Sequence, residues 1–410
     1  MLGFSTISLK IYEVILILYL PVLVKKLLLN KKLYRLIKHF VIEWKYLLLL
    51  TFVFGVLIPW EYKDELRSLS QRAFLRSLIQ IVRLFLAIFS MLIPIFWIKF
   101  KIISLKKLFK IISYVVILTF TITIIDFLSA HQIRGLIPGA RLLEGRFSGL
   151  NGEPRLFGKV MVFANILLYF AYRQSKDKVL KVAFYLTFAG IFLSASASAA
   201  VSLLFIVVPL RLIFLGFRKA FLIPVVFFIG LIIYTNGVLE GNGTVHKMEL
   251  ALGITMREKN TELSTVNEPA LFTNFEVFDR AALNFLWNNP LYIFIGTGPN
   301  LISIPSSEYV DSYSRGIYGD VINSIPHSYF INVLSRSGLI GIYIIFLFFI
   351  RFNRKLKRLD LNKLRLILIT AFIVNLTISS SLFFFVLGII ISIYIKYIYD
   401  NNSDTSSKFS

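Results

Sequence analysis

Cysteine is absent from this chain of 410 residues. Its absence excludes disulfide bonds, iron–sulfur ligation and a thiol nucleophile. Charge is also scarce, because only 16% of the residues are charged while 57% are hydrophobic, and the mean hydropathy is +0.76. A soluble chain this apolar has too few polar side chains to cover its surface. The composition therefore predicts a membrane protein.

Residues that bind metals are few and scattered. The chain has four histidines. No loop carries aspartates paired at the spacing of metal ligands, and no cluster of His, Asp and Glu has a zinc pattern. We therefore expect no metal and no other cofactor.

Long apolar segments occur along most of the chain, and most approach the length of about 20 residues that a bilayer helix requires. They cover residues 11–29, 46–60, 77–98, 111–130, 156–172, 179–195, 199–217, 220–236, 327–350, 364–380 and 382–399. The first two are the least regular, since Lys25 and Lys26 interrupt the apolar run of the first. Small residues near 195–198 and 379–382 favour tight hairpins with closely packed helices.

Basic residues alternate between connections. The connections 25–45, 99–110, 173–181, 211–219 and 351–365 hold 26 Lys and Arg against 3 acidic residues, whereas 60–76, 126–159 and 237–326 hold 14 against 16. The first set carries an excess of 23 charges, which equals the whole net charge. By the positive-inside rule this set is cytoplasmic. The basic charge is therefore a topology signal, and we expect no nucleic-acid partner.

These patterns predict an all-α, polytopic integral membrane bundle. It has about eleven transmembrane helices, an N-terminus outside, a C-terminus inside and one long outer loop with short helices. We divide the chain into N-terminal membrane helices (1–130), an outer loop with central membrane helices (131–236), a large extracytoplasmic loop (237–326), C-terminal membrane helices (327–399) and a polar tail predicted to be disordered (400–410).

The first outer loop, about residues 131–157, contains the charged stretch "GRFSGLNGEP". Its glycines and proline oppose a regular helix. Arg146, Glu153 and Arg155 lie beside the bilayer, and the guanidinium fork fits phosphate oxygens. The stretch predicts an anion site, and a solvated loop without function is the alternative.

The long outer loop, residues 237–326, adds Arg280 and the glycine turn "GTGPN". Apolar spacing predicts short helices around 269–289, ended by a proline. The glycine turn lacks the length and the lysine of a phosphate-binding loop, so alone it is weak evidence for phosphate.

Three further polar residues lie at membrane helices. His327 lies at the outer mouth of one helix, and Arg336 lies nine residues along it, about 13–14 Å. Arg83 lies near the outer end of the third predicted span. An arginine within a span is costly and usually faces a cavity or a partner. The alternatives are an interfacial histidine and arginines that extend to the membrane surface.

Four ordered stretches resemble the O-antigen polymerase and ligase superfamily of bacterial envelope proteins. They are "RFSGLNGEP", "LSASASAAVSLLF", "DRAALNFLWNNPLYIFIGTGPN" and "HSYFINVLSRSGLIG", and the resemblance covers about residues 145–345. The chain departs from the family pattern in two places. The serine-rich stretch lacks the arginine that many relatives place after the serine, and Arg336 occupies a position where relatives often carry an acid.

The resemblance implies a glycosyltransferase in the cytoplasmic (inner) membrane that acts at the outer, or periplasmic, face. Its partners would be an undecaprenyl-diphosphate-linked oligosaccharide, the lipid bilayer and a chain-length regulator protein. With this function, Arg146, Arg155 and Arg280 would bind the diphosphate, with Arg336 and Arg83 as further substrate-binding residues. His327 would orient or deprotonate the acceptor hydroxyl, with Glu153 as the other candidate base.

The loop with Glu-Pro favours a Wzy-type polymerase, which joins repeat units in lipopolysaccharide or other polysaccharide biosynthesis. The close alternative is the O-antigen ligase, which transfers the glycan to lipid A-core. A transporter or flippase is less favoured, because little charge lies within the membrane segments and no inverted repeat is visible. A membrane scaffold without catalytic activity is disfavoured by the clustered outer arginines.

Overall fold

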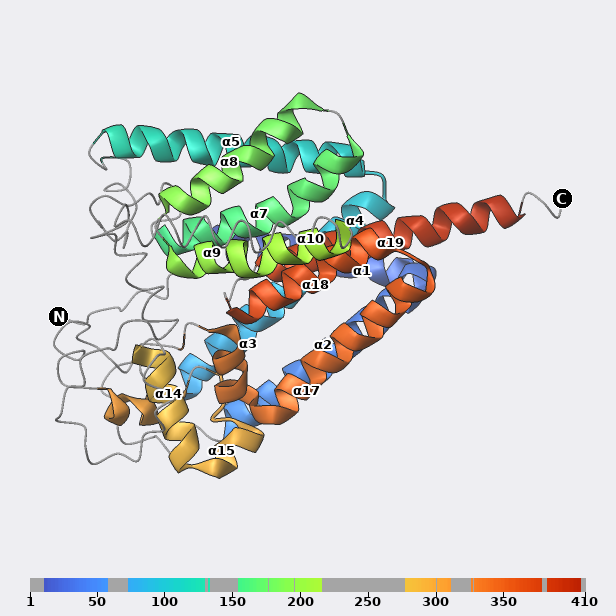
Figure 1. Cartoon of the computed structure of the whole chain (residues 1–410). Helices are drawn as coiled ribbons and strands as arrows, with labels where there is room; N and C mark the ends of the chain where they lie inside the picture. The colour runs from blue at the N-terminus through green and yellow to red at the C-terminus, as the bar shows by residue number, and fades with distance from the viewer. Residues whose placement is uncertain are drawn as a thin grey trace. The chain divides into compact units, whose positions relative to one another are not determined.

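Most of the described part of the chain is helical. A computed structural model describes residues 11–57, 73–129, 132, 154–175, 177–194, 196–215, 277–299, 301–310, 326, 328–377 and 382–406. Within these residues there is no strand, so the predicted all-α class is confirmed for them (Figure 1). The predicted span at 220–236 and most of both outer loops lie outside the described residues.

The helices follow the apolar segments of the sequence. In chain order they are α1 (Ile11–Leu29), α2 (Lys31–Leu57), α3 (Ala73–Ser90), α4 (Leu92–Lys99), α5 (Leu105–Leu128), α7 (Pro154–Gln174), α8 (Lys178–Leu193), α9 (Ala197–Val201), a π-helical turn η4 (Ser202–Val207), α10 (Val208–Leu215), α14 (Val277–Asn288), α15 (Pro290–Ile295), a 3-10 turn η7 (Pro305–Tyr309), α17 (Tyr329–Arg358), α18 (Asn362–Thr377) and α19 (Leu382–Ser406). The helix α14 lies within the predicted region 269–289. The helix α19 extends to Ser406, into the polar tail for which the sequence predicted disorder.

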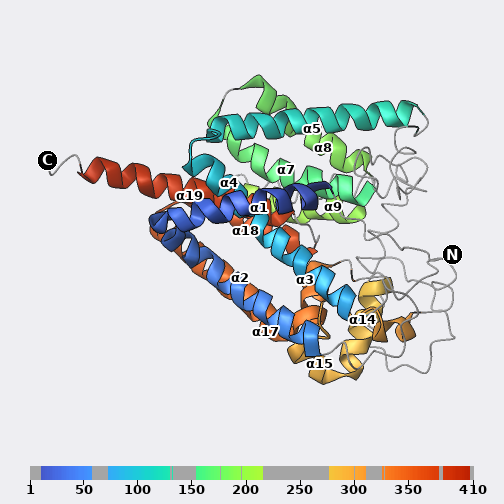
Figure 2. The same ribbon diagram turned by 180° about the vertical axis from the view of Figure 1, so that it is seen from behind.

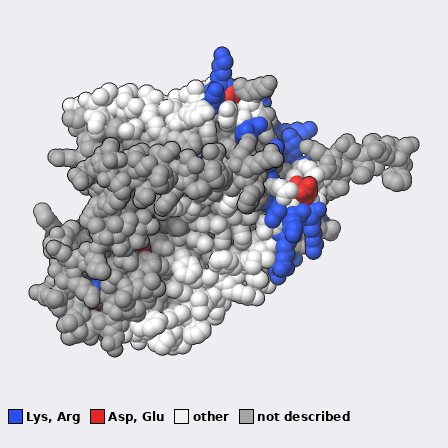
Figure 3. Space-filling view, viewed as in Figure 1, with Lys and Arg blue, Asp and Glu red and all other residues white. Residues whose placement is uncertain are grey.

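Four helical stretches are long and apolar enough to cross a membrane. They are Ser77–Lys99, Leu105–Leu128, Leu156–Arg173 and Tyr329–Arg358, and two shorter apolar helices cover Ser198–Ile213 and Leu382–Ile398. The protein is therefore a helical membrane protein. On the face seen in Figure 3, the described lysine and arginine side chains gather in a few clusters, and much of the remaining described surface is uncharged. This distribution agrees with the charge alternation in the sequence.

The chain folds into two compact units, each made of two stretches of sequence. The first unit contains Met1–Ile93 and Met256–Arg354, and the second contains Pro94–Thr255 and Lys355–Ser410. The helices α14 and α15 and most of α17 therefore fold with the N-terminal helices, which are far away in sequence.

In the first unit, α2 and α17 run antiparallel side by side (Figures 1 and 2). The ring centroids of Phe40 and Phe352 are 5.1 Å apart, and those of Trp44 and Phe348 are also 5.1 Å apart. One turn along, Arg351 Nη1 donates to Glu43 Oε1 at 2.8 Å. The buried carboxylate thus has a cation at the basic end of the helix pair, which offsets part of its desolvation.

In the second unit, small residues bring helices close together as the sequence predicted. A Cβ atom added to Gly158 of α7 would lie 2.8 Å from Cβ of Ala199 and 2.8 Å from Oγ of Ser194. No larger residue than glycine fits this approach without movement. The serine-rich stretch therefore serves packing here, and Ser194 Oγ donates to the Ile191 carbonyl at 2.7 Å.

A buried polar cluster joins α7, α8 and α10. Arg211 donates to the Asn165 carbonyl at 2.9 Å, and its guanidinium carbon lies 4.2 Å from the centre of the Tyr169 ring. Asn165 Nδ2 in turn donates to Thr187 Oγ1 at 2.7 Å. The aromatic face and the carbonyl together compensate for the desolvation of the guanidinium.

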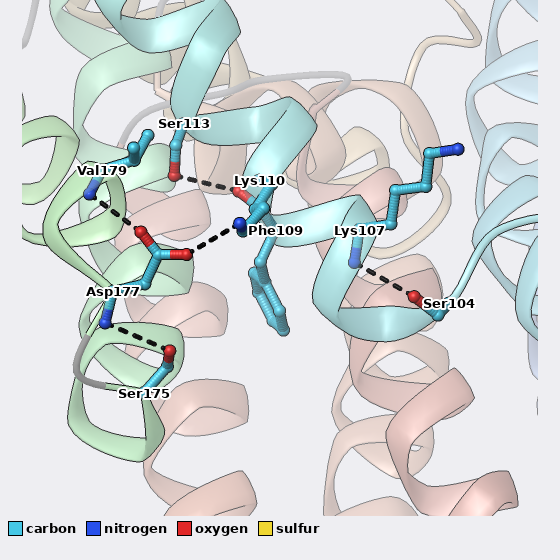
Figure 4. A network of polar contacts seen from close by, with 8 residues as sticks. All are labelled: Ser104, Lys107, Phe109, Lys110, Ser113, Ser175, Asp177 and Val179. Atoms are coloured by element: carbon cyan, nitrogen blue, oxygen red, sulfur yellow. Dashed lines mark hydrogen bonds and ion pairs between the residues drawn. The ribbon is translucent and has the colours of Figure 1, made fainter.

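At the basic end of the second unit, an ion pair links α5 to α8 (Figure 4). Lys110 Nζ lies 3.0 Å from Asp177 Oδ2, while Oδ1 of the same carboxylate accepts from the Val179 N–H at 2.9 Å and caps α8. The hydrogen bond from Lys110, the cap and the nearby positive charge hold the pKa of the Asp177 carboxyl below its usual value.

This lowered pKa predicts a pH dependence of stability. The contribution of ionised Asp177 is present above the ordinary aspartate pKa of about 3.9 and is lost as the pH falls through the lowered value. Asp177→Asn keeps the cap but loses the charge. In thermal unfolding at pH 7 the variant should melt slightly below the wild type, and the difference should shrink as the pH falls through the lowered pKa of Asp177. An equal difference at neutral and at acidic pH would contradict the ion pair.

Candidate functional site

The helix α17 is interrupted near its start. Gly338 has φ 61° and ψ −165°, which is not helical, and it separates residues 329–337 from residues 339–358. The left-handed φ strains any residue with a side chain, so glycine is needed here. An arginine, Arg336, lies in the last turn before this break.

A glycine turn, residues 296–298, packs against α17 at the break. Thr297 donates to the Ser335 carbonyl from its backbone N–H at 2.6 Å and from Oγ1 at 2.9 Å, and the Gly298 N–H donates to the Arg336 carbonyl at 3.1 Å. These are the carbonyls that lose helical partners at the end of the first segment. The turn therefore completes the hydrogen bonding of the interrupted helix.

Backbone touches backbone throughout this contact. A Cβ atom on Gly296, whose φ is 77°, would lie 2.5 Å from the Arg336 carbonyl carbon, and one on Gly338 would overlap the Phe294 carbonyl. The turn that the sequence offered only as a weak phosphate signal thus has another role, which is close packing on α17. Thr297 was not singled out from the sequence, although it lies within the "GTGPN" stretch.

The start of α17 is held by a buried carboxylate of α14. The Ser328 N–H donates to both carboxylate oxygens of Asp279, at 3.2 and 3.3 Å, and Asp279 is buried. The two elements also share an apolar core that includes Phe285, Leu286 and Leu334. The residue directly after His327 is therefore fixed to α14. Asp279 carries no separate sequence signal, since only its neighbour Arg280 matched a cation pattern.

Arg336 has buried donors without acceptors. Its Nε and Nη2 atoms are buried and have no hydrogen-bond partner among the described residues. The neighbour with which its guanidinium interacts is Tyr329, about two turns earlier on the same segment. A guanidinium has five N–H donors, and leaving buried donors unmet is costly. An anionic group at the break would satisfy them.

The other predicted site residues fall into three groups. Arg83 in α3 and Arg280 in α14 belong to the first unit together with Arg336, and both are partly buried. Arg155 lies in the first turn of α7 in the second unit, and its side chain lies outside the described residues. Arg146, Glu153 and His327 also lie outside the described residues. The roles predicted for all seven residues stay predictions.

The chain has no recognisable relative in three comparisons. No protein-family model, no curated protein and no solved structure matches it. The resemblance that the sequence motifs indicate is therefore an interpretation of the motifs themselves. Within the described residues, no group of three or more His, Cys, Asp or Glu side chains could hold a metal ion.

The glycine contact predicts a sharp mutational effect. Gly338→Ala should reduce the free energy of unfolding by at least about 1–3 kcal/mol, from left-handed strain plus the overlap with the Phe294 carbonyl. Gly190→Ala is the matched control, because its Cβ would meet the flexible side chain of Met161 at 3.0 Å and not a backbone. Thermal unfolding in detergent measures both. Equal melting temperatures for the two variants would contradict a rigid backbone contact at the break.

Proposed function

We propose that the chain is a polysaccharide polymerase that joins polyprenyl-diphosphate-linked oligosaccharide units at the outer face of the cytoplasmic membrane. It crosses the membrane about eleven times with a cytoplasmic C-terminus. The charge alternation and the helices at the predicted apolar segments support this topology. The four ordered motifs support the transferase activity.

One structural observation carries the proposal. Two of the motifs, residues 279–300 and residues 327–341, are distant in sequence but meet in space. The first contact joins Asp279 to Ser328, and the second joins Thr297 and Gly298 to the break in α17. Segments held together at both ends by polar contacts are what a site shared by two motifs requires. The contacts favour a common functional site around the start of α17.

The chemistry follows from the residue types at this site. The hydroxyl oxygen of the acceptor sugar attacks the anomeric carbon of the donor glycan. The bond from that carbon to the diphosphate breaks, and its electron pair leaves with the diphosphate. His327 takes the hydroxyl proton, while arginines stabilise the growing negative charge. Arg280 and Arg336 are the cations that the first unit provides near Ser328 and the break.

Asp279 has a positioning role in this scheme. Its carboxylate fixes the backbone N–H of the residue that follows His327. A general base acts only within hydrogen-bond reach of the proton it removes. Holding the backbone beside His327 would therefore keep its ring at the acceptor.

A deletion strain tests the function. Cells without the protein should make envelope glycan with a single repeat unit in place of a ladder, and the wild-type gene should restore the ladder. His327→Gln should lower the elongation rate of the purified protein by about 10²–10⁴-fold, the usual contribution of a general base. His246→Ala is the control, because this histidine of the long outer loop lies outside the four motifs, and the variant should keep the wild-type rate.

Other outcomes distinguish the alternatives. Long chains that accumulate on the lipid carrier without reaching lipid A-core would identify a ligase. A normal ladder in the deletion strain would contradict both transferase functions. A rate of His327→Gln above about a tenth of wild type would assign the histidine to structure.

Arg336 provides an independent test of the anion site. Arg336→Met removes a guanidinium whose buried Nε and Nη2 atoms have no hydrogen-bond partner among the described residues, so the melting temperature should stay equal or rise. The elongation rate should nevertheless fall about ten- to a hundredfold, as for one lost charge-assisted hydrogen bond of about 1.5–3 kcal/mol. Arg354→Met, at an exposed position of α17, is the control. Loss of stability in parallel with the rate would show that Arg336 is structural.

A further inference from the structure

The turn between α14 and α15 exposes large apolar side chains. Trp287 is 57% exposed, Leu291 is 65% exposed and Phe294 is 57% exposed. None of the α15 side chains is buried. We name residues 287–294 the α14–α15 elbow. An apolar surface on a loop of this kind requires a partner.

The elbow lies in an uncharged part of the long loop. No Lys, Arg, Asp or Glu occurs between Arg280 and Glu308. This is unusual for the loop as a whole, because residues 237–326 carry 15 charged side chains, ten acidic and five basic. Charged side chains are thus absent from the segment that exposes the apolar ones. Such a segment suits a nonpolar environment, because burying a charge there is costly.

The exposed surface continues onto α17. The Phe294 carbonyl packs against Gly338, so Phe294 lies beside the first residues after the break. Leu339, Ile340 and Tyr343 follow there and are 42%, 43% and 63% exposed. They belong to a helix long and apolar enough to cross a membrane, so this flank faces acyl chains. The elbow therefore adjoins a lipid-facing surface.

The uncharged part of α17 after the break is shorter than a full membrane span. Residues 339–350 extend about 18 Å as a helix, less than the hydrocarbon thickness of about 30 Å, so a break opposite the basic end lies within the far leaflet. The basic residues Arg351 and Arg354 lie near one end, and the elbow lies at the other end of the α2–α17 pair (Figures 1 and 2). The glycine turn also lies close to the end of α2, because a Cβ atom added to Gly298 would lie 3.2 Å from the Phe54 carbonyl oxygen.

We infer that the α14–α15 elbow is inserted into the lipid leaflet opposite the basic helix ends, with Trp287, Leu291 and Phe294 against acyl chains below the head groups. Tryptophan is enriched near membrane surfaces, and apolar helix faces bury about 5–10 Å into the boundary between head groups and acyl chains. Part of the loop predicted to be extracytoplasmic then lies in lipid. The elbow holds the glycine turn, and through it the break in α17, within that leaflet. The inference does not depend on the transferase activity.

Site-directed spin labelling tests the insertion in the full chain, because without native cysteine each introduced cysteine is the sole thiol. Nitroxides are attached to Leu291→Cys and Phe294→Cys. Tyr343→Cys on α17 is the lipid control, and Glu308→Cys, which is exposed, is the water control. The protein is reconstituted in phosphatidylcholine–phosphatidylglycerol vesicles. Power saturation compares collisions with oxygen, which concentrates in lipid, and with a water-soluble nickel chelate.

At Leu291 and Phe294, oxygen collisions should exceed nickel collisions severalfold, as at Tyr343, while Glu308 shows the reverse. Values like those of Glu308 at both positions would overturn the insertion. Low access to both reagents with dipolar broadening would also overturn it, because a second copy of the chain would then cover the elbow. Both side chains are more than half exposed, so their replacement removes little packing.

Discussion

The contact between the glycine turn and the interrupted helix α17 is the interaction on which the first unit depends. A helix that ends within or near a bilayer leaves carbonyl groups without partners, and lipid offers none. Thr297 and Gly298 supply donors to the Ser335 and Arg336 carbonyls. These donors come within hydrogen-bonding distance only because Gly296 and Gly338 lack a Cβ atom. The described part of the chain between α14 and the start of α17 meets at this backbone contact.

The interruption also explains why polar groups collect at the start of α17. Once the glycine turn satisfies the carbonyls, residues 329–337 form a short segment whose beginning is capped by Asp279. Arg336 is then placed at the end of that segment with buried donors available to an anion. A continuous helix would carry Arg336 on its flank, where the side chain would extend to the nearest water. Because of the break, an arginine that would be costly to bury within a span becomes a candidate anion-binding residue.

In the second unit, the donors of the buried polar cluster have partners within the protein. The Arg211 guanidinium lies against the Tyr169 ring and donates to the Asn165 carbonyl, and Asn165 Nδ2 donates to Thr187 Oγ1. Arg211 follows a π-helical turn, Ser202–Val207, which changes the direction of side chains on the helix. The comparison between Arg211 and Arg336 shows that a buried arginine alone does not indicate a site. Whether a buried arginine marks a site depends on its hydrogen-bond partners, and the fold determines those partners.

Much of the architecture was predictable because the bilayer imposes strong rules on sequence. Apolar length predicted the helices Ser77–Lys99, Leu105–Leu128 and Tyr329–Arg358, and the charge alternation predicted basic helix ends. The close approach at Gly158 was also predictable, since small residues cluster at the hairpin near Ser194. The helix α14 followed from apolar spacing and the proline after it. These are local properties, so composition and periodicity are sufficient to find them.

The candidate site depended on contacts between distant residues, which local patterns do not encode. Asp279 was overlooked because a single acid before Arg280 has no pattern of its own, and its role exists only where Ser328 meets it. The glycine turn was read as a weak phosphate signal, because its true neighbour lies about forty residues later in α17. The sequence by itself determined that this protein is helical and embedded in a membrane, since hydrophobic burial follows from composition. Only the tertiary structure decided where the helix breaks and which carbonyls the turn completes, because both require two separate backbones in contact.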